Sequence, residues 1–178
     1  EQVAFRYCSS LKSVRIPNSV LSMDSYCFEG CASLQNIVLP NSLNSISEFA
    51  FKDCSKLESI TIPSNVKSIG NGVFKGCTNL QEINVASDNL YYKSIQGVLF
   101  DKEETSLIQM PANSQILTYE IPASVKSLGH SAFRLCTQLK EIHCLPTTPP
   151  TITVSGFSSE VLNNCKLYIP KGSYNAYW

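Results

Sequence analysis

A 23-residue period is the feature that most constrains the fold of this chain. Four cysteines and three prolines recur at this spacing, and apolar residues keep fixed offsets from each cysteine, three positions before it and three, six and eight positions after it. The repeated residues are Cys8, Cys31, Cys54 and Cys77, with Pro17, Pro40 and Pro63. A fixed period of this length indicates a solenoid, in which each repeat forms one coil that packs on the next.

The spacing of apolar residues changes within one repeat. Residues 74–80, Phe-x-x-Cys-x-x-Leu, place apolar groups three positions apart, which indicates a short helical or 3₁₀ turn. Residues 60–62, Ile-Thr-Ile, alternate with a period of two, which indicates a strand. Pro63 ends that strand because proline cannot donate a ladder hydrogen bond. One coil is therefore predicted to contain a strand, a turn, a return segment and a helical turn.

The complete pattern of one repeat is distinctive. It reads Leu57-x-x-Ile60-x-Ile62-Pro63-x-x-Val66-x-x-Ile69-Gly70-x-x-x-Phe74-x-x-Cys77. This pattern resembles the BspA-like class of leucine-rich repeats, and the resemblance covers nearly the whole chain. It implies a right-handed leucine-rich-repeat solenoid of the α/β class, rich in β-structure, with a parallel sheet on one face and short helical or 3₁₀ turns. It also implies secreted or surface-displayed proteins of host-associated bacteria, to which adhesion to host proteins is usually assigned.

We expect one solenoid over residues 1–178, because a single repeat cannot bury its own apolar face and stacked repeats share one continuous core. Regular repeats occupy residues 1–85, a 36-residue variant repeat about 86–121, and a final repeat 122–144. Residues 145–178 leave the pattern but stay rich in apolar and aromatic residues. They are predicted to form a cap over the last apolar layer, with a final strand at Lys166–Ile169.

The variant repeat contains Gln96-Gly97 between two apolar stretches, which indicates a tight turn such as that of a hairpin. Residues 105–110 and 117–121 have the composition of further short strands. Two interpretations stay open for this repeat, a lengthened coil, which is favoured, and an excursion that binds a ligand. A carbohydrate site built from Tyr91, Tyr92 and Phe100 is a minor alternative, which rings open to solvent would favour and buried rings would exclude.

Eight cysteines raise the question of disulfides. The repeated column, which Cys136 joins in the final repeat, places thiols on successive coils about 4.8 Å apart and parallel. A disulfide needs converging Cβ atoms about 3.8 Å apart, so we predict a ladder of buried free thiols. A bridge between Cys144 and Cys165 stays open. No set of cysteines and histidines has the spacing of a zinc site, so we expect no metal.

Charge and motifs argue against several classes of function. Fourteen basic residues balance fourteen acidic ones and none form a basic run, so the chain lacks the footprint of a nucleic-acid-binding protein. No apolar stretch is long enough to span a membrane, and the sequence opens without a signal peptide. His130 in a turn and His143 on a strand have no recognised nucleophile context. We therefore predict no catalytic residue, no enzyme activity and no cofactor.

Residues that alternate with the core residues of each strand are predicted to face solvent and to form a partner-binding surface. They vary between repeats, whereas the core columns keep their apolar character. One exposed column contains Arg15, Val38, Thr61, Asn84 and His143, and its neighbour contains Ser13, Asn36, Ser59, Glu82 and Glu141. Solenoids commonly bind partners through such broad, rigid faces.

Our leading hypothesis is a monomeric, secreted or cell-surface module that binds an extracellular protein through this face. The alternative is a structural role, in which the repeats form a spacer or stalk within a larger surface protein and bind nothing themselves. Substitutions at Arg15, Thr61 and Asn84 separate the two hypotheses, because binding that survives all three excludes the face as the site.

Overall fold

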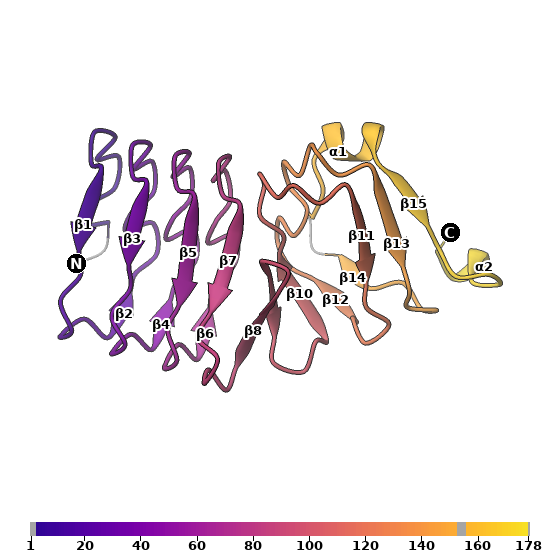
Figure 1. Ribbon diagram of the computed structural model, residues 1–178, viewed down its shortest axis with the longest axis horizontal. Helices are drawn as coiled ribbons and strands as arrows, with labels where there is room; N and C mark the ends of the chain where they lie inside the picture. The colour runs from indigo at the N-terminus through magenta and orange to yellow at the C-terminus, as the bar shows by residue number, and fades with distance from the viewer. Residues whose placement is uncertain (1–2, 153–155, 178) are drawn as a thin grey trace.

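The computed structural model of the protein describes residues 3–152 and 156–177. The chain winds into a solenoid of about seven coils, which stack along the long axis and leave the two ends of the chain at opposite ends of the molecule (Figure 1). Each coil contributes one strand to the same side, and we call these the front strands. They are β1 (Ser13–Arg15), β3 (Asn36–Val38), β5 (Ser59–Ile62), β7 (Glu82–Val85), β11 (Thr118–Ile121), β13 (Glu141–Cys144) and β15 (Lys166–Tyr168).

The chain then returns through shorter strands, which we call the return strands. They are β2 (Ser22–Met23), β4 (Ser45–Ile46), β6 (Ser68–Ile69), β10 (Ser106–Gln109), β12 (Ser127–Leu128) and β14 (Thr151–Ile152). The remaining elements are β8 (Tyr92–Ile95), β9 (Val98–Asp101), α1 (Ser159–Asn164) and α2 (Tyr174–Tyr177). The front strands and the return strands thus enclose the core from two sides, as a solenoid requires.

The front strands run in parallel and pair as β1-β3, β5-β7 and β11-β13-β15, in the register that the repeat predicts. On β5 and β7, Ser59 lies opposite Glu82 and Ile60 lies opposite Ile83, so residues 23 apart in the sequence are neighbours. The predicted alternation also holds, because Ile60 is buried in the core and Thr61 is exposed. The prediction of a leucine-rich-repeat solenoid with mostly parallel strands is confirmed.

The predicted helical turn of each coil is a 3₁₀-type turn and not a continuous helix. The N–H of Cys54 donates to the carbonyl of Phe51 (N–O 3.2 Å), and the N–H of Leu57 donates to the carbonyl of Cys54 (3.1 Å). Two residues of the turn, two positions before and two after the phenylalanine, adopt left-handed conformations that interrupt any longer helix. In the third turn these are Phe49 and Asp53, at φ 56° and 59°.

A column of stacked phenylalanine rings joins the first four turns. The ring centroids lie 5.0, 5.5 and 5.9 Å apart, with nearly parallel planes. The rings belong to Phe5, Phe28, Phe51 and Phe74. Because neighbouring rings stack with nearly parallel planes, each turn gains aromatic contacts in addition to the burial of its apolar side chains.

The cysteine column forms the predicted ladder of free thiols, with one exception. Each buried thiol donates a weak hydrogen bond to the phenylalanine carbonyl of the preceding turn, with Sγ–O distances of 3.1 Å from Cys31, 3.2 Å from Cys54 and 3.0 Å from Cys77. The prediction that Cys8 is buried is wrong for the described residues, among which no coil covers its turn on the side away from Cys31, and the residue is exposed. Cys136 is buried as predicted.

The open question of a bridge between Cys144 and Cys165 is answered by their contacts. Both cysteines are free, and the Sγ of Cys144 accepts a hydrogen bond from the hydroxyl of Tyr177 at an O–S distance of 2.9 Å. The same hydroxyl lies 2.7 Å from the carbonyl oxygen of Pro146. Cys144 therefore anchors the C-terminal segment through a hydrogen bond.

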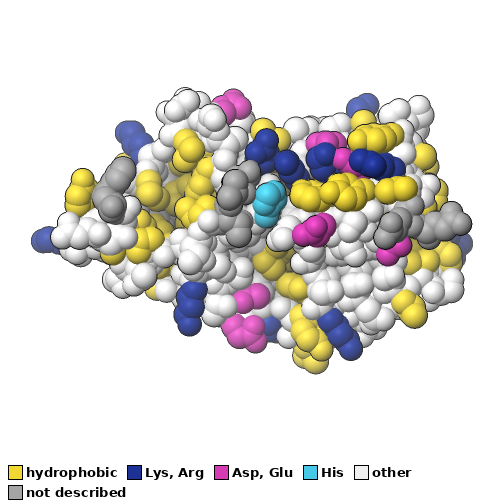
Figure 2. Space-filling model, turned by 180° about the vertical axis from the view of Figure 1, so that it is seen from behind, with side chains coloured by type: hydrophobic (Ala, Val, Ile, Leu, Met, Phe, Trp, Pro, Cys, Tyr) yellow, Lys and Arg dark blue, Asp and Glu magenta, His cyan; other side chains and the backbone are white. Residues whose placement is uncertain are grey.

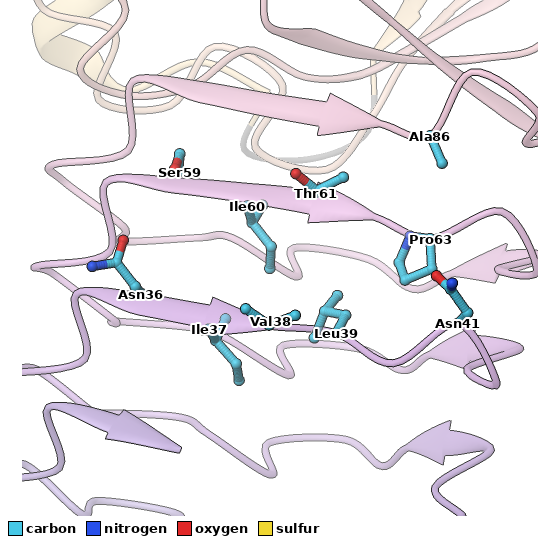
Figure 3. A pocket seen from close by; sticks show the side chains of 10 residues that line it. All are labelled: Asn36, Ile37, Val38, Leu39, Asn41, Ser59, Ile60, Thr61, Pro63 and Ala86. Carbon is cyan, nitrogen blue, oxygen red and sulfur yellow. The ribbon is translucent and has the colours of Figure 1, made fainter. Parts of the chain in front are cut away.

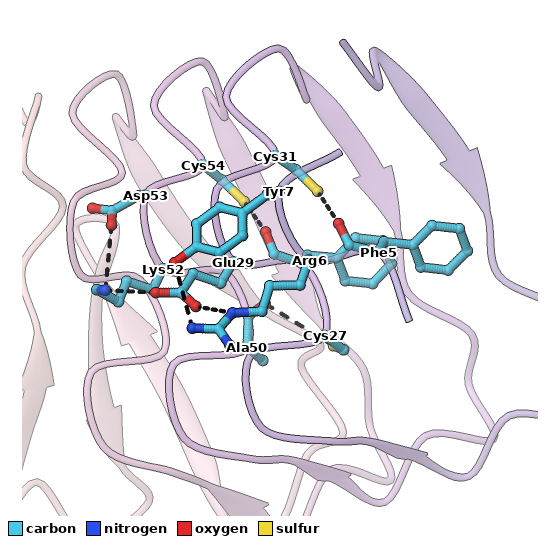
Figure 4. Close-up of polar contacts among 11 residues, drawn as sticks. Phe5, Arg6, Tyr7, Cys27, Glu29, Cys31, Ala50, Lys52, Asp53 and Cys54 are labelled. Carbon is cyan, nitrogen blue, oxygen red and sulfur yellow. Dashed lines mark hydrogen bonds and ion pairs between the residues drawn. The ribbon is translucent and has the colours of Figure 1, made fainter. Parts of the chain in front are cut away.

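A buried carboxylate links three turns on the outside of the cysteine ladder. The side chain of Glu29 is 2% exposed and lies between Arg6 (Nε–Oε2 2.5 Å) and Lys52 (Nζ–Oε1 2.6 Å), each 23 residues away (Figure 4). Seen from behind, the N-terminal coils carry a row of basic and acidic side chains beside a row of hydrophobic ones (Figure 2). A buried charge is tolerated here because two cations neutralise it and hydrogen-bond to both of its oxygens.

The variant repeat inserts a hairpin into the fourth coil. β8 and β9 are antiparallel, with Ile95 opposite Val98 across the Gln96-Gly97 turn, so the predicted hairpin is confirmed. β10 and β11 lie within the two further segments that were predicted as strands. β9 also pairs with β10. The strands β14-β12-β10-β9-β8 therefore form one sheet in this order, and the strands β2-β4-β6 form another.

The hairpin also divides the core in two. One cluster, the N-terminal core, extends from Met23 to Ile83 and includes Leu99. The other, the C-terminal core, extends from Val98 to Cys144 and includes Phe100. Because side chains alternate along a strand, β9 sends Leu99 into the first cluster and both of its neighbours into the second. The hairpin thus lies between the two cores and contributes side chains to both.

The minor alternative of an aromatic carbohydrate platform on this hairpin is wrong. Phe100 is fully buried in the C-terminal core. The hydroxyl of the half-buried Tyr92 accepts a hydrogen bond from the N–H of Ile69 (N–O 2.9 Å). Of the three rings, Tyr91 alone is exposed, and one isolated ring does not make a platform.

The C-terminal segment has the layout of one more coil. β14 pairs with β12, β15 pairs with β13, and the ring of Phe157 stacks on Phe133 with centroids 5.0 Å apart. β15 ends at Tyr168, one residue before the predicted end of the last strand. The segment covers the preceding coil as a cap does, yet it presents apolar side chains of its own, since Leu167 on β15 is 59% exposed.

Candidate partner-binding face

The ten residues predicted to bind a partner lie on five front strands, at positions that alternate with core residues. Six of them are exposed, namely Ser13, Arg15, Asn36, Val38, Thr61 and Glu82. Four are half-buried, namely Ser59, Asn84, Glu141 and His143. Their placement follows from the two-residue period of a strand, which turns every second side chain away from the core.

These residues form two separate groups. The N-terminal face carries eight of them on β1, β3, β5 and β7, where the parallel register sets residues 23 apart side by side. The C-terminal face, on β11, β13 and β15, carries the other two. Between them stands the tip of the hairpin, where the N–H of Ile83 on β7 donates to the carbonyl of Gly97 (N–O 2.9 Å). The column from Arg15 to His143 is therefore divided between Asn84 and His143, and its role in binding stays a prediction.

Val38 is the centre of the N-terminal face. Its side chain is 80% exposed, which makes it the most exposed large hydrophobic residue of the described chain. Two hollows flank it. One of about 410 Å³ lies towards Thr61 and Pro63 (Figure 3). The other, of about 500 Å³, lies towards Arg15. Ile37 and Ile60 point to the opposite side of the sheet from Val38, into the core. An apolar ridge between two hollows offers shape as well as area to a partner.

Polar groups surround this ridge. Arg15, on the neighbouring strand β1, is exposed and forms no ion pair with the residues that the structure describes. On the other side, the Nδ2 of Asn84 donates to Oε1 of Glu82 at 2.9 Å. At the end of the strands, the Nδ2 of Asn65 donates to the carbonyl of Asn41 (2.6 Å). The face thus combines one apolar centre with a polar rim, which is the usual composition of a binding patch.

The C-terminal face is a compact polar cluster. The ring of His143 stacks on Tyr168 with centroids 4.5 Å apart, and its Nε2 lies 3.4 Å from Oε2 of Glu141. The hydroxyl of Tyr168 donates to Oε1 of the same carboxylate at 3.3 Å. Lys166 lies opposite Glu141 in the register of β13 and β15. These contacts hold the side chains to one another and leave no isolated apolar ridge of the kind seen at Val38.

Sequence reasoning missed four residues of this second face. They are Thr118, Glu120, Lys166 and Tyr168. A signal for Glu120 was present, because it stands two positions before Pro122 as Thr61 stands two positions before Pro63. The signal for Tyr168 was weaker, because its repeat follows a stretch with no recognisable period.

Among the residues that the structure describes, neither histidine belongs to a group typical of an enzyme site. His143 has a carboxylate and a tyrosine beside it but no serine or cysteine nucleophile. His130 lies against the ring of Phe49 in an edge-to-face contact, with centroids 5.9 Å apart. Within residues 3–152 and 156–177, no three metal-ligating side chains gather, and no helix has the length and apolar character needed to cross a membrane.

The sequence matches the family model of the BspA type leucine-rich repeat region over residues 1–118 and 112–175, with six copies of the repeat. Among solved structures, the chain is similar to a leucine-rich cell surface protein from Faecalibacterium prausnitzii, at 31% identity and a TM-score of 0.78 over 86% of this chain. It is also similar to the pneumococcal vaccine antigen PcpA, at 25% identity and a TM-score of 0.80 over 90% of this chain. The match covers 40% of the length of each of these two proteins. Comparison with curated proteins finds no match.

Proposed function

Because the chain belongs to the BspA-type leucine-rich repeat family, we propose that it is a non-enzymatic binding module of a bacterial cell-surface or secreted protein. The partner is an extracellular protein, and the module engages it through the N-terminal face. The similar protein of Faecalibacterium prausnitzii is described as a cell surface protein, which supports the location. Adhesion to another cell or to its matrix is the role that such binding serves.

The observation that carries this proposal is the exposure of Val38. A branched apolar side chain that is 80% exposed on β3, with β1 on one side and β5 on the other, has no role in the core. Burial of such a residue in a partner would stabilise a complex, and the two hollows beside it would accept side chains of that partner. Arg15, which forms no ion pair with described residues, adds a positive charge at the rim, which favours a partner with acidic groups near the contact.

The test begins with the capture of a partner from extracellular-matrix and serum proteins, followed by affinity measurements with variants. We expect Val38→Asp to weaken binding about 30-fold, because it places a charge at the centre of the contact. Arg15→Glu, Thr61→Ala and Asn84→Ala should weaken it less. Leu21→Asp is the matched control, since Leu21 is 59% exposed but lies outside the front strands.

Three results would contradict the proposal. Binding that survives the substitutions at Val38, Arg15, Thr61 and Asn84 would move the site away from the N-terminal face. An equal loss from Leu21→Asp would point to a general effect on the coil. Absence of any captured partner for the intact chain would favour the structural alternative, in which the repeats serve as a spacer.

A further inference from the structure

The first three turns share a ladder of backbone hydrogen bonds that the fourth turn does not continue. In the third turn, the N–H groups of Phe49, Phe51 and Asp53 donate to carbonyls of the fourth turn, with N–O distances of 3.1, 3.0 and 2.8 Å. The acceptors are the carbonyl oxygens of residues 71, 73 and 75. These donors stand at alternate positions, as along the edge of a strand.

The equivalent donors of the fourth turn are Gly72, Phe74 and Gly76. Within the described ranges, 3–152 and 156–177, their N–H groups find no acceptor. The fifth turn keeps the central bond of this ladder with the turn after it, since the N–H of Met110 donates to the carbonyl of Ala132 (N–O 2.8 Å). One interface in the stack has therefore lost its ladder, and we call this interface the seam.

The hairpin explains the seam. β9 pairs with β10, the strand that leads into the fifth turn, and sets Phe100 opposite Leu107 and Leu99 opposite Gln109. Backbone groups near the fifth turn are therefore engaged with the hairpin instead of the fourth turn. Buried N–H groups are rarely left without a partner in folded proteins, so the donors of the buried Gly72 and Phe74, with that of the half-buried Gly76, need an explanation.

A cavity of about 300 Å³ occupies the seam. Gly72 and Phe74, with two of the free N–H groups, line one wall, and Ile108 and Gln109 line the other. The amide nitrogen of Gln109 donates to the carbonyls of Met110 and Ser131 at 3.0 Å each, so its oxygen is left as an acceptor. A ligand that fits must supply acceptors at alternate positions, a donor for the amide oxygen, and apolar contact.

We propose that the seam binds a short extended peptide, which lies along the fourth turn as residues 71–75 lie along the third. The main chain of a peptide carries carbonyls at the required two-residue spacing and N–H donors between them, the chemistry of strand addition. The residues that line the cavity include no lysine or arginine, and the one histidine, His130, is accompanied by the carboxylate of Asp101. A neutral main chain therefore suits the cavity better than a carboxylate or phosphate ligand does.

A synthetic peptide with the sequence of residues 71–75, acetylated and amidated, is the probe because the third turn already accepts this segment. We expect it to produce saturable shifts of the amide resonances of Gly72, Phe74 and Gly76 in a titration of ¹⁵N-labelled protein. Hydrogen exchange of these three amides should slow at least about tenfold at saturation. Unchanged resonances and exchange rates at millimolar peptide would overturn the proposal.

Paired variants test the location. Ser106 lines the cavity, and Ser127 lies beside it on the next return strand without lining it. We expect Ser106→Phe to weaken peptide binding at least about tenfold and Ser127→Phe to leave it unchanged. An equal effect of the two substitutions would overturn the proposal, as would shifts that a panel of monosaccharides produces and the peptide does not. The titration of the unsubstituted protein remains decisive if either variant fails to fold.

This proposal does not depend on the function of the N-terminal face. Val38→Asp should leave the peptide titration unchanged, because Val38 does not line the cavity. A protein that loses its extracellular partner but keeps the peptide would separate the two sites.

Discussion

The first four turns and the last three are built from the same pattern, yet they differ in how completely neighbouring coils engage. In the first group, stacked rings, thiols and turn N–H groups bond each coil to the next. In the fifth turn, Met110 takes the phenylalanine position, and the ring stack resumes only with Phe133 and Phe157. The thiol of Cys136 still reaches the carbonyl of Met110, but at 3.7 Å.

The difference shows what an insertion costs a solenoid. The thirteen residues beyond one period (36 less 23) are accommodated by a hairpin, and both flanking groups of coils keep their own register. The loss is confined to one interface, where the turn ladder and the continuous core both end. Because each coil contacts only its neighbours, damage at one interface does not spread.

The largest contrast we expect is in thiol reactivity. Burial raises the pKa of Cys77 and of Cys136 to about 12, so at pH 8 only about 10⁻⁴ of each is thiolate. Cys8 occupies the same column but is exposed. In native protein, a maleimide should therefore modify Cys8 at least about 10³-fold faster than Cys77, as peptide mass mapping would show. Rapid modification of Cys136 but not of Cys77 would mean that the C-terminal core opens more readily than the N-terminal one.

The next largest effect concerns the ring stack. Phe51 is fully buried between Phe28 and Phe74, so Phe51→Ala should destabilise the protein by about 3–5 kcal/mol. Phe133→Ala should cost about as much in the C-terminal core, since Phe133 is also fully buried. Urea unfolding measures the free energy, and hydrogen exchange locates the loss. If each variant weakened protection equally in both cores, the hairpin would not separate them.

Glu29→Gln should destabilise the N-terminal coils by about 2 kcal/mol, because it removes charge-assisted hydrogen bonds from a buried position. Arg134 occupies the position of Arg6 and Lys52 in the sixth turn and forms no ion pair with described residues, so Arg134→Gln serves as the matched control. The control should leave the free energy of unfolding nearly unchanged.

The contribution of Glu29 should depend on pH. Burial alone would raise the pKa of its carboxyl group, but hydrogen bonds from Lys52 and Arg6 outweigh burial and lower it. A lowered pKa in the folded state stabilises the fold above the unfolded value of about 4.3 and loses that effect as pH falls through the lowered pKa. The difference between the parent and Glu29→Gln should therefore shrink below about pH 4, and an unchanged difference at pH 3 would contradict the assignment.

The smallest effect is expected from the turn backbone. Gly76 adopts a φ of +80°, and a Cβ there would meet the carboxylate of Asp53 one turn earlier. Gly76→Ala should cost about 1 kcal/mol. In an Asp53→Ala background the collision disappears and only the cost of the left-handed conformation remains, so thermal unfolding of the single and double variants separates the two causes. A double variant no more stable than Gly76→Ala alone would show that the contact is irrelevant.

The repeat predicted most of the fold because each column has one environment in every coil. It gave the front strands, the free thiols and the Gln96-Gly97 hairpin in advance. It could not give the division of the N-terminal and C-terminal faces, because that depends on where the hairpin tip packs and not on its sequence. It also could not give the exposure of Cys8, since the burial of a column position depends on which described coils pack against it.

The period also contains the information for a charged contact that the sequence analysis did not predict. Arg6, Glu29 and Lys52 are spaced by 23 residues with alternating charge, so the register alone places them side by side. Val38 was identified as one exposed residue among ten, but its prominence comes from the hollows beside it, which depend on backbone shape at the strand ends. The periodic sequence thus predicts neighbours well and surface relief poorly.

The seam has a mechanical consequence. Coils stacked along one axis form a chain of links in series, so a pull between the two ends loads every interface with the same force. Interfaces with hydrogen-bond ladders, stacked rings and thiol hydrogen bonds distribute that force over many contacts. The seam has fewer contacts over which to distribute it. We expect extension to begin there, between the fourth and fifth turns, while the coils on either side stay wound.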